Sequence, residues 1–145
     1  VIIVSKAFAE KHGMSPLAEL ISYGQVAGPD TSLLTQPSRA ILNALERCEI
    51  DLDDIDLFEI NEAFAAVSVA SVMDLGIPDE IVNVNGGAIA LGHPIGMSGN
   101  RLALTLSYEL KRRGWHRCSC FMWRWRARRC SHPQSPKIVD FSYLI

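Results

Sequence analysis

Short apolar runs alternate with amphipathic stretches over residues 1–114, and this alternation leaves few folds open. Continuous apolar runs such as residues 1–4 are typical of strands that are buried on both faces. Stretches with an apolar residue every three or four positions are typical of helices that cover a sheet. Strands and helices that alternate at this spacing predict an α/β fold of stacked layers. We expect strands over 1–4, 16–28 and 81–87, an acidic turn that ends as a strand over 51–60, and helices over 6–13, 36–50, 61–76 and 98–114.

Small residues mark the expected ends of these helices. Ser5 can cap the first helix by accepting a hydrogen bond from its first turn. Gly13, Gly76 and Gly114 can adopt the left-handed conformation that ends a helix. The helix over 36–50 has a stronger apolar side, and we expect that side to face the core through Ala40, Leu42, Ala44, Leu45 and Cys48.

Length, charge and cysteine usage narrow the classes of function. A chain of 145 residues with 48% hydrophobic residues can bury one sizeable core. Its formal net charge of -2 gives no overall attraction to nucleic acid or to a membrane. No apolar run approaches the roughly 20 residues of a membrane span, and residues 1–13 lack the layout of a signal peptide. The cysteines show no secreted disulfide pattern, so we expect a cytoplasmic protein.

A first pair of polar residues follows the strand expected to end at residue 60. Asn61 and Glu62 stand where "LFEI" gives way to a helix, and the carboxyl ends of strands are where open α/β sheets bind ligands. A second interpretation is that Asn61 only caps the helix, because asparagine is a favoured N-cap residue. Spacing alone favours the capping role.

The second polar feature is the glycine-rich segment "NGGAIALGHPIGMSG" at residues 85–99. Its glycines allow left-handed turns and close approach of the backbone, and Pro94 restricts the chain beside His93. An imidazole held in such a turn suits a general base or an oxyanion donor. The alternative is an ordinary glycine-rich connection with a hydrogen-bonded histidine. The segment is no phosphate-binding loop, because it lacks the Gly-Lys-Ser/Thr ending.

Together, "NEAFAA" and "NVNGGAIALGHPIGMSG" resemble the thiolase family, the acetyl-CoA C-acyltransferases, over about residues 1–114. The resemblance implies a pair of similar layered α/β domains, with residues 1–15 ending the N-terminal domain and 16–114 forming the C-terminal domain. It implies acyl transfer between acyl-CoA and acetyl-CoA, by thiolysis or Claisen condensation, through an acyl-cysteine intermediate. Coenzyme A thioesters would be the substrates, and neither a cofactor nor a metal is implied.

The resemblance also implies roles for individual residues. His93 would activate the nucleophilic cysteine and help bind the thioester oxygen, and Asn61 would position a water in the oxyanion hole. Ala63 and Phe64 would line the acyl pocket. In this family the nucleophilic cysteine belongs to the N-terminal half of the enzyme. We therefore expect that half to be a partner of this chain, and we expect the parent enzyme to be a homo-oligomer. Cys48 is no substitute, because its helical position suits a structural thiol.

The basic tail at residues 115–145 departs from the family, which has a second catalytic cysteine in a Cys-x-Gly loop near this point. Met122 and Trp123 have unique codons, ATG and TGG, which read Cys-Gly when displaced by one base. Trp125 followed by Arg126 gives a further glycine in the same frame. We therefore expect the tail to be the product of a frameshift and the chain alone to be inactive.

Other interpretations of the tail remain. The spacing of "CSC" and "CSH" matches no four-ligand zinc pattern. The run "RWRARR" suits salt-sensitive binding of polyanions but not a folded nucleic-acid module. The main alternative to an enzyme is a non-catalytic, thiolase-like binding or interaction protein whose basic tail binds a partner.

Overall fold

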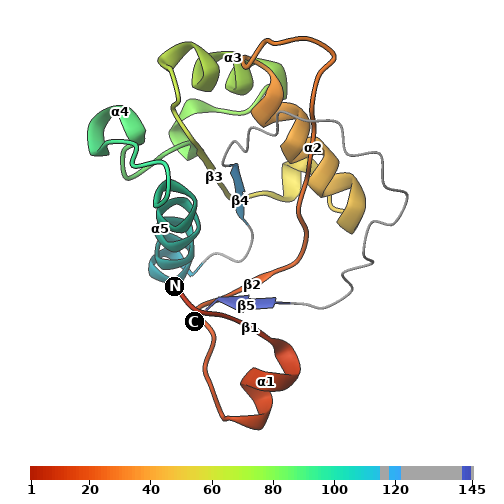
Figure 1. Cartoon of the computed structure of the whole chain (residues 1–145), viewed down its shortest axis with the longest axis vertical. Helices are drawn as coiled ribbons and strands as arrows, with labels where there is room; N and C mark the ends of the chain where they lie inside the picture. The colour runs from red at the N-terminus through yellow and green to blue at the C-terminus, as the bar shows by residue number, and fades with distance from the viewer. Residues whose placement is uncertain (115–117, 122–141, 145) are drawn as a thin grey trace. The chain divides into compact units, whose positions relative to one another are not determined.

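The computed structural model describes residues 1–114, 118–121 and 142–144, and these divide between two compact units. Among the described residues, one unit comprises 1–21 and 142–144, and the other comprises 22–114 and 118–121. Figure 1 labels the elements of both. The expected tail at 115–145 lies largely outside the described residues, and so do its frameshift and zinc interpretations.

The smaller unit holds a sheet of short strands. Strand β5 (Ser142–Leu144) pairs antiparallel with both β1 (Ile3–Ser5) and β2 (Ala18–Leu20). Helix α1 (Lys6–Lys11) follows β1, and Ser5 accepts a hydrogen bond from Phe8 N at 3.3 Å, as expected of its cap. The expected burial of residues 1–4 on both faces is wrong, because Ile3 is 57% exposed. In the described part of this unit α1 is the only helix, so this part offers the strand at most one covering helix.

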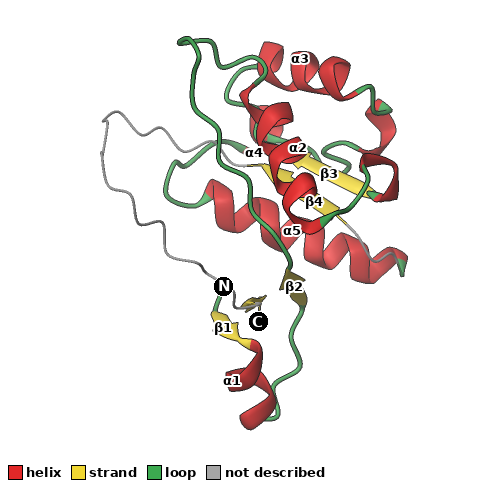
Figure 2. Ribbon diagram, turned by 90° about the vertical axis from the view of Figure 1, so that its right-hand side faces the viewer, coloured by secondary structure: helices red, strands yellow, loops and turns green. Residues whose placement is uncertain are grey.

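The larger unit is built on two parallel strands, β3 (Leu57–Ile60) and β4 (Cys118–Phe121), with helices packed against them. Because side chains alternate along a strand, the two faces of β3 meet different helices. Phe58 and Ile60 face helix α2 (Gln36–Cys48), whereas Glu59 faces helix α5 (Ser98–Arg113) and contacts Arg101. Figure 2 shows both helices alongside the strand pair. The other described elements of this unit are α3 (Ala65–Leu75) and α4 (Ala88–Leu91), with 3-10 turns at Leu52–Asp54 and Asp79–Ile81.

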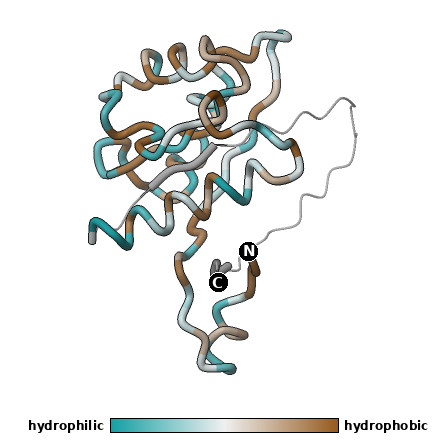
Figure 3. Tube along the Cα trace, turned by 90° about the vertical axis from the view of Figure 1, so that its left-hand side faces the viewer, coloured by the Kyte–Doolittle hydropathy of each residue, from teal (hydrophilic) through white to brown (hydrophobic). Residues whose placement is uncertain are grey.

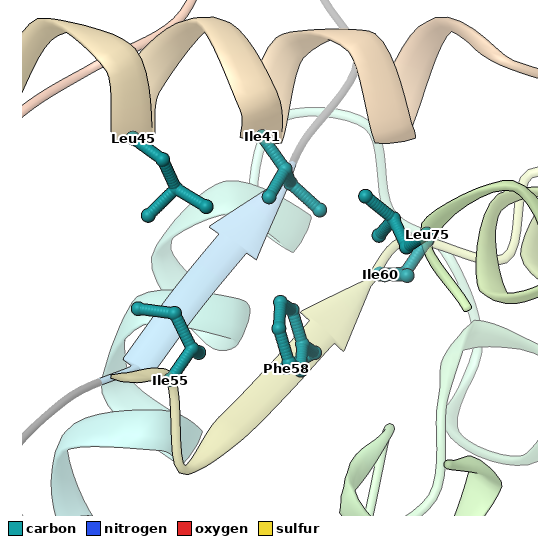
Figure 4. Close-up of a cluster of buried hydrophobic side chains, with 6 residues drawn as sticks. All are labelled: Ile41, Leu45, Ile55, Phe58, Ile60 and Leu75. Carbon is teal, nitrogen blue, oxygen red and sulfur yellow. The ribbon is translucent and has the colours of Figure 1, made fainter. Parts of the chain in front are cut away.

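The core of this unit lies between α2, β3 and the end of α3. Figure 4 shows Ile41 and Leu45 of α2 pointing toward Phe58 and Ile60 of β3. All four residues of β3 are buried, which matches the continuous apolar character of that strand apart from Glu59. Helices α2 and α5 carry both polar and apolar residues, and the tube in Figure 3 passes repeatedly between the two kinds. This is the amphipathic pattern from which the helices were predicted.

The helix expected over 36–50 is confirmed, but the prediction of which side it buries was partly wrong. Leu42, expected to face the core, is 45% exposed, whereas the neighbouring Ile41 is only 1% exposed. A helix turns by about 100° per residue, so a face centred on Ile41 and Leu45 leaves Leu42 toward solvent. The helices ending at Gly76 and Gly114 are also confirmed, since both glycines adopt left-handed backbone angles.

Two expected strands are shorter than predicted or absent. Only Ala18–Leu20 is a strand within 16–28, and the following segment runs along α2, where a Cβ on Gly24 would lie 1.9 Å from Ala40 O. The strand expected over 81–87 is wrong: the described residues there contribute a single parallel bridge, between Val82 and Phe58. Asn83 then takes a left-handed φ of 47°, which ends the extended run. No helix among the described residues is long and apolar enough to span a membrane.

Candidate functional site

Asn61 follows β3 directly and is buried, with 2% of its surface exposed. The helix expected from residue 61 begins later, because α3 starts at Ala65 and its N-cap residue is Phe64. No side-chain hydrogen bond caps this helix, so the capping interpretation of Asn61 is wrong. The Asn61 side chain is therefore directed to another contact.

That contact is His93, which lies 32 positions further along the chain. Asn61 Nδ2 is 3.4 Å from His93 Nε2, at the long end of the range for a hydrogen bond. His93 follows Gly92, whose φ of 90° is a conformation that glycine tolerates and other residues rarely adopt. The turn brings an exposed imidazole to the buried amide at the end of β3. The two residues singled out from separate motifs thus meet in space.

The other imidazole nitrogen is held by Ser98, the first residue of α5. His93 Nδ1 lies 2.6 Å from Ser98 Oγ, and Ser98 Oγ donates to Pro94 O at 3.1 Å. Since the hydroxyl has one proton and directs it to Pro94, the remaining bond requires His93 Nδ1–H to donate to Ser98. The tautomer assigned from this network leaves a lone pair on Nε2, opposite the Asn61 amide.

Sequence reasoning missed Ser98, which is fully buried. Its signal was present, because Ser98 stands five residues after His93, at the start of a strongly predicted helix. The contacts from Ser98 to His93 and from His93 to Asn61 determine what the site can do chemically. A neutral imidazole with a bare Nε2 can accept a proton, and an amide N–H beside it can donate to a developing oxyanion.

Ala63 and Phe64 lie between Asn61 and α3. Ala63 N donates to Asn61 O at 3.0 Å, so Ala63 belongs to the tight turn that follows Asn61. Phe64 is 65% exposed and presents its ring to the surface. Their expected role in an acyl pocket stays a prediction.

A buried ion pair lies next to the site. Glu59, two residues before Asn61, is 1% exposed, and its carboxylate lies 3.4 Å from Arg101 Nη1 in the first turns of α5. Burial raises the pKa of Glu59 to about 7, and the Arg101 charge and hydrogen bond offset only part of this cost. The pair links the strand that carries Asn61 to the helix that carries Ser98.

Cys48 differs from a reactive thiol in its surroundings. Cys48 is half-buried, and its Sγ contacts two carbonyl oxygens of its own helix, Ala44 O at 3.3 Å and Leu45 O at 3.4 Å. These contacts are those of a structural thiol. The described residues contain no cluster of three or more His, Cys, Asp or Glu side chains that could hold a metal ion.

Comparisons with known proteins agree on one family. The sequence profile described as "Thiolase, C-terminal domain" matches residues 14–120. The chain is 56% identical over 114 residues to a probable acetyl-CoA acetyltransferase of Mycolicibacterium smegmatis, covering 79% of this chain and 29% of that protein. It is 48% identical over 115 residues to the cytosolic acetyl-CoA acetyltransferase of Mus musculus, with the same coverage of each chain.

Solved structures show the same likeness. The acetyl-CoA acetyltransferase of Bacillus anthracis aligns with a TM-score of 0.72 at 45% identity, over 77% of this chain and 28% of that one. Human mitochondrial 3-ketoacyl-CoA thiolase in complex with CoA aligns with a TM-score of 0.73 at 44% identity, over the same shares. The chain spans less than a third of the length of the relatives it matches. The fold, the matched profile and these identities place the chain in the thiolase family, within its C-terminal domain.

Proposed function

We propose that this chain carries part of the active site of a thiolase, which transfers acyl groups between acyl-CoA and acetyl-CoA through an acyl-cysteine intermediate. The observation that supports this proposal is the contact between Asn61 Nδ2 and His93 Nε2, with His93 Nδ1 held by Ser98. The two side chains come from separate motifs, and together they provide a base and an oxyanion donor.

His93 acts as the base that activates the nucleophilic cysteine. With Nδ1–H donated to Ser98, Nε2 carries the lone pair that can take the thiol proton. The resulting thiolate attacks the carbonyl carbon of the acyl thioester, the carbonyl electrons move to oxygen, and the CoA thiolate leaves as the carbonyl reforms. His93 is exposed, so a cysteine from another segment of the enzyme can reach it.

Asn61 contributes to the stabilisation of the negative charge that forms on the thioester oxygen. Its amide is neutral and buried at the strand end, so the donor is held in place before the reaction begins. The resemblance places a water between this amide and the substrate oxygen. Asn61 Oδ1 is buried without a partner among the described residues, and a water at this position could donate to it while also binding the substrate.

The remaining parts of the proposal concern the surroundings of this pair. Ala63 and the exposed ring of Phe64 contact the acyl group. Residues 1–15 end the N-terminal domain, 16–114 belong to the C-terminal domain, and 115–145 form a frameshifted tail. Both cysteines come from other segments of a homo-oligomeric, cytoplasmic parent enzyme of lipid metabolism, so this chain alone is inactive.

The test is thiolysis of acetoacetyl-CoA by the complete enzyme that contains this segment. We expect His93→Ala to lower kcat by about two to four orders of magnitude, and Asn61→Ala to lower it by about 10²-fold. His12→Ala, an exposed histidine at the end of α1, serves as the control and should leave kcat unchanged. Wild-type turnover by His93→Ala would refute the proposed role. The 145-residue chain alone should show no thiolysis above that of a free thiol.

A further inference from the structure

The side chain of Asn83 takes the place of a strand residue at the end of β3. Its Oδ1 accepts from Ile60 N at 2.8 Å, and its Nδ2 donates to Ile60 O at 2.9 Å. Its backbone N donates to Phe58 O at 2.9 Å. A side-chain amide that pairs with both main-chain groups of one residue reproduces a sheet contact. Asn83 therefore holds the residue directly before Asn61.

Glu62, the residue directly after Asn61, continues this network toward the glycine-rich loop. Glu62 Oε1 accepts from Asn83 Nδ2 at 3.3 Å, and Oε2 accepts from Ile89 N in α4 at 2.8 Å. The carboxylate thus connects the end of β3 to the short helix that leads into Gly92 and His93. Both residues that flank Asn61 in sequence are held by the same set of contacts.

Gly87 completes the network because its lack of a side chain leaves room for the Glu62 carboxylate in its hydrogen-bonded position. A Cβ at Gly87 would lie 2.2 Å from the carboxyl carbon of Glu62, closer than any packed contact. The Gly87 φ of -103° is accessible to every residue. A side chain at Gly87 would therefore compete with the Glu62 carboxylate for space, and Glu62 would have to move away from its hydrogen-bond partners to admit it.

We propose that Asn83, Glu62 and Gly87 form a positioning clamp that holds the His93 loop against Asn61. Asn83 and Glu62 are positioning residues, since they act on the reaction through the separation of Asn61 Nδ2 from His93 Nε2. The inference rests on the proposed function, because that separation matters only if the two side chains act together. A purely structural role would change the stability of α4 and leave the imidazole in place.

Gly87→Ala is the sharpest perturbation, since the added methyl group displaces Glu62 without changing any polar group. Gly96→Ala is its matched control, in the same loop and with nothing within 4 Å of the added Cβ. The readout is the ¹⁵N NMR spectrum of the His93 imidazole in the full chain, at a pH where the ring is neutral. His93→Gln identifies the signals.

In the wild type we expect one protonated and one bare nitrogen, with widely separated shifts, as the Ser98 contact requires. In Gly87→Ala and in Asn83→Gly, which keeps the left-handed backbone accessible, the Nε2 shift should move because the Asn61 contact is lost. Gly96→Ala should match the wild type. In a Glu62→Ala background the further change to Gly87→Ala should have little effect, because its clash partner is gone.

Wild-type shifts in any folded clamp variant would overturn the inference, and the amide spectrum shows which variants fold. Glu62→Ala decides the matter if Gly87→Ala unfolds the chain, because it removes the carboxylate without a steric clash. The imidazole shifts report hydrogen bonding whether or not a thioester is cleaved. Failure here would leave the proposed function standing, whereas active His93→Ala enzyme would refute that function and leave the clamp geometry intact.

Discussion

Replacing Glu59 with glutamine should remove a pH dependence of stability that the buried carboxyl creates. Glu59 is 1% exposed and its pKa is raised to about 7, from 4.5 in the unfolded chain, with burial as the largest cause. Arg101 is the nearest cation and Glu62 adds a repulsive charge. The folded state therefore binds this proton more tightly than the unfolded state does.

The sign and size of the effect follow from proton linkage. A carboxyl with a raised pKa contributes stability that is fully present below pH 4.5 and is lost as the pH rises to about 7. The difference between the two pKa values corresponds to about 3 kcal/mol when 1.4 kcal/mol is assigned to each tenfold change in affinity. Glutamine does not titrate, so the unfolding free energy of the Glu59→Gln variant lacks this dependence on pH.

The assay is urea unfolding of the full chain and of Glu59→Gln from pH 4.5 to pH 8. We expect the wild type to lose about 2–3 kcal/mol relative to Glu59→Gln over this range, with most of the change below about pH 7. Asp79→Asn, at an exposed 3-10 turn, is the control. Its free energy of unfolding should change with pH in parallel with that of the wild type. A wild-type curve that runs parallel to Glu59→Gln would show that Arg101 neutralises the cost of burial. The reasoning from desolvation would then be wrong.

Three further predictions concern the core, the site and the tail. Ile41→Ala should destabilise the chain by about 2–5 kcal/mol in urea unfolding, whereas the neighbouring exposed Leu42→Ala should cost under about 1 kcal/mol; equal costs would contradict the observed helix face. Ser98→Ala should lower kcat of the complete enzyme by about tenfold or more, through loss of the Nδ1 contact, with KM little changed; an unchanged kcat would exclude this role. The DNA for residues 121–127 should read Cys-Gly-x-Gly one base later and remain open beyond it; a stop codon directly after these glycines would count against the frameshift.

The elements that sequence reasoning located correctly are those with local signals. The apolar run of β3, the Ser5 cap and the glycines that end α3 and α5 each act within a few residues of their own position. The phase of α2 was less certain, since Ile41 and Leu42 are both apolar and only packing against Phe58 distinguishes them. Local patterns therefore predicted where elements lie better than which side they bury.

The errors arose where a side chain replaced regular structure. Residues 81–87 have the composition of a strand, but Asn83 turns left-handed and pairs with Ile60 through its side chain. No periodicity in the sequence reveals that a side chain takes the place of a strand in this way. Asn61 likewise has the spacing of a helix cap, whereas its position beside His93 depends on folding over 32 residues. Only the resemblance to a family connected these two residues before the structure did.

The most direct measurement of the central claim is a double-mutant cycle between Asn61 and His93 in the complete enzyme. The values of kcat are compared for wild type, Asn61→Ala, His93→Ala and the double variant in acetoacetyl-CoA thiolysis. If the two side chains act on one transition state across their 3.4 Å contact, the double variant should be about as slow as His93→Ala alone. Losses that simply multiply would show two independent residues and contradict a shared site.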